Sequence, residues 1–331
     1  MPLISLIITY FNKSNFIEYL LNCIVKNPIF DYEIILINDG SNDYSTDKLK
    51  KILRRKKFKK VNYFFTENLG VSSAKNLGII KAQGKYIWFL DGDDYLSINW
   101  SQELLKIIKS DKDYDVIAID FLRFVDGKVG SVPWLSYRCF NGEYDYSNYI
   151  DCWYNIGNNY QYIFLNKFIK TNNLSFNENL FIGEDALFNV NAFIKANDVL
   201  SYRVPIYIQN QSIKNSLSRP NKNKITKTII NEMYAHSLIK EKVRQNIFAN
   251  FVFVCDFTYH RLQAIKKIET YDNLNVSDAI LLRNYLSIIY NEYLNDKNWF
   301  DLGSYVEGAL GFKLNELNSF KENFKLLNSL L

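Results

Sequence analysis

The chain has 331 residues, 48% of them hydrophobic, which is enough to bury the core of one large or two moderate domains. Its 40 lysine and arginine residues against 35 acidic residues leave a net charge of only +5, which argues against a dedicated nucleic-acid binder. No stretch reaches the roughly eighteen apolar residues that span a bilayer, and the start lacks a charged leader region, so we expect a cytoplasmic protein.

The segment from residue 4 to residue 90 alternates between strand and helix patterns. Strands are predicted at 4–9, 32–37, 61–65 and 86–90, and helices at 17–25, 45–57 and 71–82. This alternation favours an α/β fold with a parallel, doubly wound sheet and helices on both faces. In such sheets, ligands bind outside the carboxyl ends of the strands.

Polar residues follow each predicted strand. They lie at 9–12, 38–43, 67–70 and in the tetrapeptide Asp91-Gly92-Asp93-Asp94. Three carboxylates in four residues raise one another's pKa values unless a cation or a hydrogen-bond donor lies among them, and hard oxygen ligands suit Mg²⁺ or Mn²⁺. Taken alone, the tetrapeptide is equally compatible with a turn. Because the four loops share one edge of the sheet, we expect them to converge on one site.

Four segments in a fixed order carry a family resemblance. They read Ile-Ile-Thr-Tyr-Phe-Asn at 7–12, Glu-Ile-Ile-Leu-Ile-Asn-Asp-Gly-Ser-Asn-Asp at 33–43, Glu-Asn-Leu-Gly-Val-Ser-Ser-Ala-Lys-Asn-Leu-Gly at 67–78, and Phe-Leu-Asp-Gly-Asp-Asp at 89–94. This order resembles the family 2 glycosyltransferases of the GT-A fold, over residues 3 to about 219. The resemblance implies a Rossmann-like, mostly parallel sheet flanked by helices. It also implies an inverting enzyme that transfers a sugar from a UDP-sugar to a glycan hydroxyl with Mn²⁺ or Mg²⁺.

The same resemblance implies roles for individual residues. Asp39 takes the uracil-reading position, where a carboxylate can accept the imide N–H. Lys75 stands where the family often has arginine, and it keeps the charge without the forked geometry. Asp93 is the implied metal ligand, and Asp91 faces the ribose or a metal-bound water. The other implied donor-binding residues are Thr9, Phe11, Asn12, Gly70 and Gly92; the family commonly has proline and tyrosine at the first two positions.

A second acidic segment, Glu184-Asp185, lies just before a helix predicted over 186–196. Taken alone, this pattern is more often a helix cap than a catalytic site. A helix N-terminus stabilises ionised carboxylates, which suits a general base. Together with Leu-Ser-Phe-Asn at 174–177, the segment matches the family's Glu-Asp motif. The resemblance implies that Asp185 removes the acceptor proton and that Glu184 orients the loop or the acceptor.

Two downstream cations and the C-terminal region complete the predicted organisation. Lys214 and Arg219 follow a strand predicted over 202–209 and are candidates to close over the donor diphosphate, although solvated loop charges fit them equally well. We expect residues 1–220 to form the catalytic domain. Residues 221–331 are predicted to be a helical appendage for acceptor, homo-oligomer or membrane-surface contact.

The basic run 48–60 contains nine lysine or arginine residues and no acid. Three interpretations are open for this run. We rank a solvated helix face first, a surface for anionic lipid headgroups second, and a nucleic-acid patch last. The lipid alternative would place the protein peripherally on the inner face of the cytoplasmic membrane, with a glycan or lipid-linked glycan as acceptor.

Two other classes of function remain open. A sugar-nucleotide nucleotidyltransferase shares an acidic α/β site, but the expected glycine-rich triphosphate loop is absent after the first strand. A non-catalytic scaffold is the other alternative. Sugar identity depends on the region 126–160, where three aromatic residues can stack on a sugar or fill the core, namely Trp134, Trp153 and Tyr154.

Overall fold

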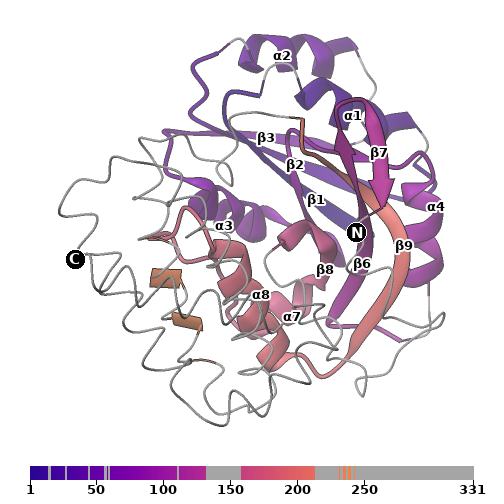
Figure 1. Ribbon diagram of the computed structural model, residues 1–331, viewed down its shortest axis with the longest axis vertical. Coiled ribbons are helices and arrows are strands. Elements are labelled where there is room, and N and C mark those ends of the chain that lie inside the picture. Colours follow the sequence, from indigo (N-terminus) through magenta and orange to yellow (C-terminus); the bar gives the residue numbers. More distant parts are fainter. Residues whose placement is uncertain are drawn as a thin grey trace, which may run out of the picture.

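The computed structural model describes residues 1–131 and 158–212, except 14–15, 27, 44, 56–57, 59 and 110–111, together with a few helical residues between 231 and 242 (Figure 1). Most of the predicted appendage and its boundary at residue 220 lie outside the described residues. Among the described residues, no helix has the length and apolar character needed to cross a membrane.

The N-terminal half forms the predicted strand and helix alternation. Its elements are β1 (Ile4–Tyr10), α1 (Ile17–Lys26), β2 (Tyr32–Asp39), α2 (Ser45–Arg55), β3 (Val61–Thr66), α3 (Val71–Lys81) and β4 (Tyr86–Asp91). The strands pair in parallel in the order β3-β2-β1-β4. The carboxyl ends of all four strands therefore lie at one edge of the sheet, as predicted.

The second half of the chain extends the same sheet with a different topology. Its elements are β5 (Tyr95–Leu96), α4 (Trp100–Ile108), β6 (Val116–Val125), β7 (Lys128–Ser131), the 3₁₀ turn η2 (Asn159–Gln161), β8 (Tyr162–Leu165), α7 (Asn166–Thr171), α8 (Glu184–Lys195) and β9 (Val199–Asn210). Beyond β4 the order is β8-β6-β9-β5, and β7 pairs with β6. Among the described strands of this half, β6 and β9 alone pair in parallel. The α/β class is confirmed, and the structure adds a mixed half to the parallel one.

Both faces of the sheet are covered, which explains why the central strands are almost uniformly apolar. Side chains alternate between faces along a strand, so Ile7 packs with α3, α7 and α8, whereas Leu6 and Ile8 pack with α1, α2 and α4. Figure 1 shows these two groups of helices on either side of the sheet.

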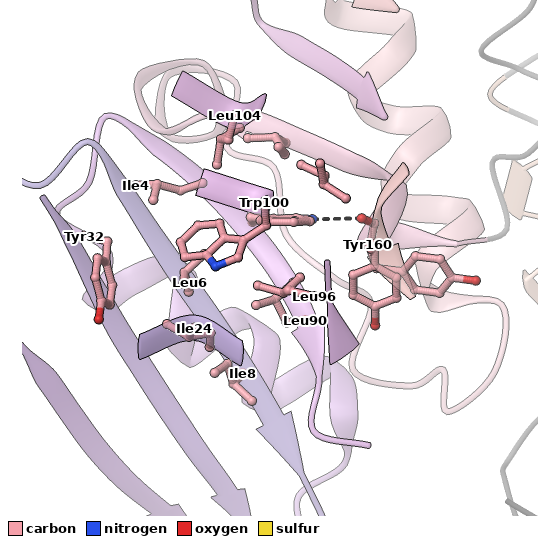
Figure 2. Packing of buried hydrophobic residues seen from close by; sticks show 14 of the residues in the cluster. Ile4, Leu6, Ile8, Ile24, Tyr32, Leu90, Leu96, Trp100, Leu104 and Tyr160 are labelled. Carbon is pink, nitrogen blue, oxygen red and sulfur yellow. Dashed lines mark hydrogen bonds between the residues drawn. The ribbon is translucent and has the colours of Figure 1, made fainter. Parts of the chain in front are cut away.

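The second of these cores contains two buried tryptophans that tie distant segments together. Trp88 Nε1 donates to the carbonyl oxygen of Tyr160 at 2.8 Å. Figure 2 shows Tyr160 and Trp100 among the apolar side chains of this core. Trp100 Nε1 donates to the carbonyl oxygen of Cys23 at 3.2 Å. Each indole N–H is thus satisfied inside an apolar cluster, where an unpaired donor would be costly.

Candidate active site

The loops after β1 and β2 are fixed to each other by Asn12. Its backbone N–H donates to Ser41 Oγ at 2.9 Å, and its side-chain oxygen accepts from the backbone N–H groups of Asn42 and Asp43 at 3.0 and 3.3 Å. Asn12 adopts a φ of 52°, which asparagine tolerates better than most residues. Phe11, beside it, is exposed at the sheet edge. A ligand at this edge therefore meets loops that are already held together.

Asp39, the implied uracil-reading residue, anchors the loop after β3. Its Oδ1 accepts from Thr66 Oγ1 and from the backbone N–H of Leu69, both at 2.8 Å, and its Oδ2 accepts from the N–H of Gly70 at 2.9 Å. A carboxylate has about four acceptor sites, so these bonds leave capacity for one further donor. The sequence pattern did not indicate this anchoring role.

The turn after β4 lies directly against the end of β1. The N–H of Gly92 donates to the carbonyl oxygen of Thr9 at 3.1 Å. A Cβ at position 92 would lie 2.7 Å from Tyr10 Cβ, which real side chains do not tolerate. Glycine therefore allows the acidic turn to approach the first loop. Thr9, although implied in donor binding, is itself buried at this contact.

Asp94 is separated from the other two acids of the tetrapeptide by its contacts with β9. Its side chain accepts from the Tyr207 hydroxyl and from the backbone N–H of Asn210, the latter at 2.7 Å. Burial, reinforced by Asp91 and Asp93, holds its pKa well above the usual value. The third carboxylate of the tetrapeptide therefore ties the turn to β9.

The other two acids face cations. Asp93 Oδ2 forms an ion pair with Lys13 Nζ, a residue that the sequence pattern did not single out. The pKa of Asp91 is raised to about 6, chiefly by burial, because burial together with Asp93 and Asp185 outweighs the lowering effect of Lys75 and Lys13. Several charges of both signs thus act on one carboxylate.

The two carboxylates can hold a divalent ion only together with other ligands. Within the described ranges, no three His, Cys, Asp or Glu side chains gather as a metal site. Mg²⁺ and Mn²⁺ commonly bind one or two carboxylates and complete their shell with water and substrate phosphates. Asp91 and Asp93 supply that kind of partial donor set, and a nearby cation would offset the burial that raises the pKa of Asp91. The residues present fit such an ion when a diphosphate accompanies it.

Lys75 joins α3 to the second acidic segment. Its Nζ lies 2.5 Å from Asp185 Oδ1 and 3.3 Å from Glu184 Oε1, and the side chain is only 4% exposed. Burial alone lowers the pKa of Lys75, but attraction to Asp185, Glu184 and Asp91 outweighs it and raises the pKa. The ammonium is thus charged and engaged by the two α8 carboxylates, although the resemblance placed it among the donor-binding residues.

Glu184 and Asp185 lie in the first turn of α8, which begins two residues before the predicted helix. Gly183 precedes them with a φ of 79°, a left-handed conformation that favours glycine. Burial and repulsion from Asp185 raise the pKa of Glu184 to about 7 against the pull of Lys75. Asp185 Oδ2 accepts from the backbone N–H of Asn159 at 3.2 Å. The pair is therefore oriented by groups from two other elements.

Asn159 is a second residue that the sequence pattern did not indicate. Its side-chain amide donates to Asn189 Oδ1 at 3.0 Å, so η2 contacts both the start and the middle of α8. The remaining predicted residues Lys214, Arg219, Trp134, Trp153 and Tyr154 lie outside the described residues. The structure thus brings together the predicted residues of β1, β2, β4, α3 and α8.

Comparison with known proteins identifies the family. Residues 5–195 match the model of Glycosyl transferase family 2. The chain belongs to this family. This glycosyltransferase is 29% identical to the uncharacterized glycosyltransferase EpsJ of Bacillus subtilis over 225 residues, 66% of this chain and 63% of EpsJ. It is 25% identical to the cholesterol galactosyltransferase of Borreliella burgdorferi over 329 residues, 95% of this chain and 88% of that protein.

Solved structures support the same fold. The glycosyltransferase resembles Staphylococcus aureus TarS 1–349 with a TM-score of 0.63 and 19% identity, over 86% of this chain and 79% of that one. TarS 1–349 in complex with UDP-GlcNAc matches with a TM-score of 0.55 and 21% identity, over 80% of this chain and 81% of that one. The predicted GT-A fold and transferase class are confirmed.

Proposed function

We propose that this glycosyltransferase moves a hexose or N-acetylhexosamine from a UDP-sugar to a hydroxyl of a growing glycan, with inversion and with the help of Mn²⁺ or Mg²⁺. The supporting observation is the grouping of Asp185, Lys75 and Asp91, in which Lys75 contacts the first carboxylate and all three interact electrostatically. A general base lies at the same sheet edge as carboxylates that can hold a metal for the diphosphate leaving group. This arrangement suits displacement at an anomeric carbon.

The residues have complementary chemical roles in this proposal. Asp185 accepts the proton of the attacking hydroxyl and faces the positive charge that develops on the sugar. Lys75 and the Asn159 N–H hold Asp185 in place. When bound by Asp91 and Asp93, the divalent ion would supply charge stabilisation to the diphosphate leaving group.

A uridine donor is supported by the one acceptor site left on Asp39 and by the TarS complexes with UDP and UDP-GlcNAc. The glycan acceptor is proposed to be lipooligosaccharide, capsule or a related polysaccharide, free or lipid-linked. One relative is named for transfer to cholesterol, which supports a lipid-borne acceptor. We further propose peripheral contact with the inner face of the cytoplasmic membrane and self-association through residues 221–331.

A screen of UDP-sugars, with and without Mn²⁺, tests the donor and metal assignments. We expect UDP to raise the melting temperature only when Mn²⁺ is present, and Asp93→Asn to abolish this effect. Asp113→Asn is the matched control, since Asp113 is exposed and pairs with Lys85 at the opposite end of β4. UDP affinity that is independent of metal and unchanged in Asp93→Asn would contradict the proposal. If the enzyme hydrolyses one UDP-sugar and no other, that sugar is identified as the donor.

A further inference from the structure

The ion pair between Lys13 and Asp93 places a cation of the protein itself on the proposed metal ligand. Both side chains are mostly buried, with 21% and 18% of their surfaces exposed. The preceding residue, Asn12, is bonded to the loop after β2, which holds the start of this segment at the sheet edge. Lys13 therefore has a fixed base and a flexible four-carbon stem whose ammonium carries three donors.

A metal ion and this ammonium compete for one carboxylate. A divalent ion bound to Asp93 would repel the Lys13 ammonium at close range, and it would also remove the partner of that ammonium. A donor diphosphate changes this balance because it offers negative oxygens to both cations. Metal binding should then be weak without nucleotide and much stronger with it.

We propose that Lys13 neutralises Asp93 in the donor-free enzyme. When metal and nucleotide bind together, the Lys13 side chain moves so that its ammonium pairs with the donor diphosphate instead of Asp93. The inference rests on the proposed function, which makes Asp93 a metal ligand. Its consequence is thermodynamic coupling: UDP increases the affinity for Mn²⁺, and Mn²⁺ increases the affinity for UDP by the same factor. Removing Lys13 should reduce that factor.

The test is a titration of Mn²⁺ into the full chain by calorimetry, with and without UDP, for the wild type and Lys13→Met. We expect the Mn²⁺ association constant without UDP to rise about three- to tenfold in Lys13→Met, the scale of a partly buried ion pair. We expect the UDP coupling factor to fall by at least the same amount. Lys85→Met removes the same charge from an ion pair with Asp113 at 2.5 Å, away from the tetrapeptide, and should change neither quantity.

Three outcomes would overturn the inference. An unchanged Mn²⁺ affinity without UDP would show that Lys13 does not compete for Asp93. If the Mn²⁺ affinity of Lys13→Met rose equally with and without UDP, Lys13 would only repel the metal ion through space. Its ammonium would then not move to the diphosphate. If Mn²⁺ bound no form of the protein and Asp93→Asn behaved as the wild type, the metal in the proposed function would fail as well. Lys13→Gln, checked by its melting temperature, repeats the test if the methionine variant folds poorly.

Discussion

Glu184→Gln should stabilise this glycosyltransferase above neutral pH. Glu184 is buried in the first turn of α8 with its Oε1 3.3 Å from Lys75 Nζ. Burial and Asp185 raise its pKa from 4.5 to about 7 despite that lysine. The folded enzyme therefore keeps a proton that the unfolded chain releases. Glutamine preserves the shape of the side chain and removes the ionisation.

The sign and the size of the effect follow from this shift. Between pH 4.5 and about 7 the folded state binds more protons than the unfolded state, so the free energy of unfolding decreases as the pH rises. The contribution of Glu184 is fully present below that window and is lost as the pH rises through it. The shift from 4.5 to about 7 corresponds to about 3 kcal/mol at pH 8. At pH 5 the difference between Glu184→Gln and the wild type should be less than about 1 kcal/mol.

Urea unfolding at pH 5, 6, 7 and 8 measures this difference directly. Glu178→Gln is the matched control, because Glu178 is an exposed carboxylate in the segment before α8 that accepts from Asn76 Nδ2 at 2.9 Å. The control should show no gain that grows with pH. The reasoning is refuted if Glu184→Gln is no more stable than the wild type at pH 8, or if its gain is the same at pH 5 and pH 8.

Two further predictions concern catalysis and membrane contact. Asp185→Asn should bind UDP-sugar nearly normally in calorimetry while its transfer rate falls at least about a hundredfold, and near-wild-type transfer would move the base to Glu184. The exposed cations of α2 (Lys50, Lys51 and Arg54) should bring the protein down with anionic liposomes, each contributing roughly 1 kcal/mol at low salt. Equal recovery with neutral and anionic vesicles would mean that these side chains only add solubility.

The sequence by itself determined the parallel half of the sheet and the edge at which we propose the donor site. Its strands and helices are local patterns: apolar runs such as 32–37 and 86–90, separated by helices with an apolar face, and polar residues at each strand end. Such patterns can be recognised from residues that are close together in the sequence. The acidic tetrapeptide and Glu184-Asp185 were visible in the same way, as unusual local composition.

Tertiary structure decided the mixed half of the sheet and the role of each charged side chain. β8 has only four residues, and its place between β4 and β6 depends on pairing with strands far away in the chain. The tetrapeptide contains three acids with similar local surroundings, and β9, more than 110 residues later, makes Asp94 the buried anchor. Lys13 and Asn159 carry no local signal, because their importance comes from partners 80 and 26 residues away. Burial and charge pairing depend on such distant contacts, so only the fold could assign them.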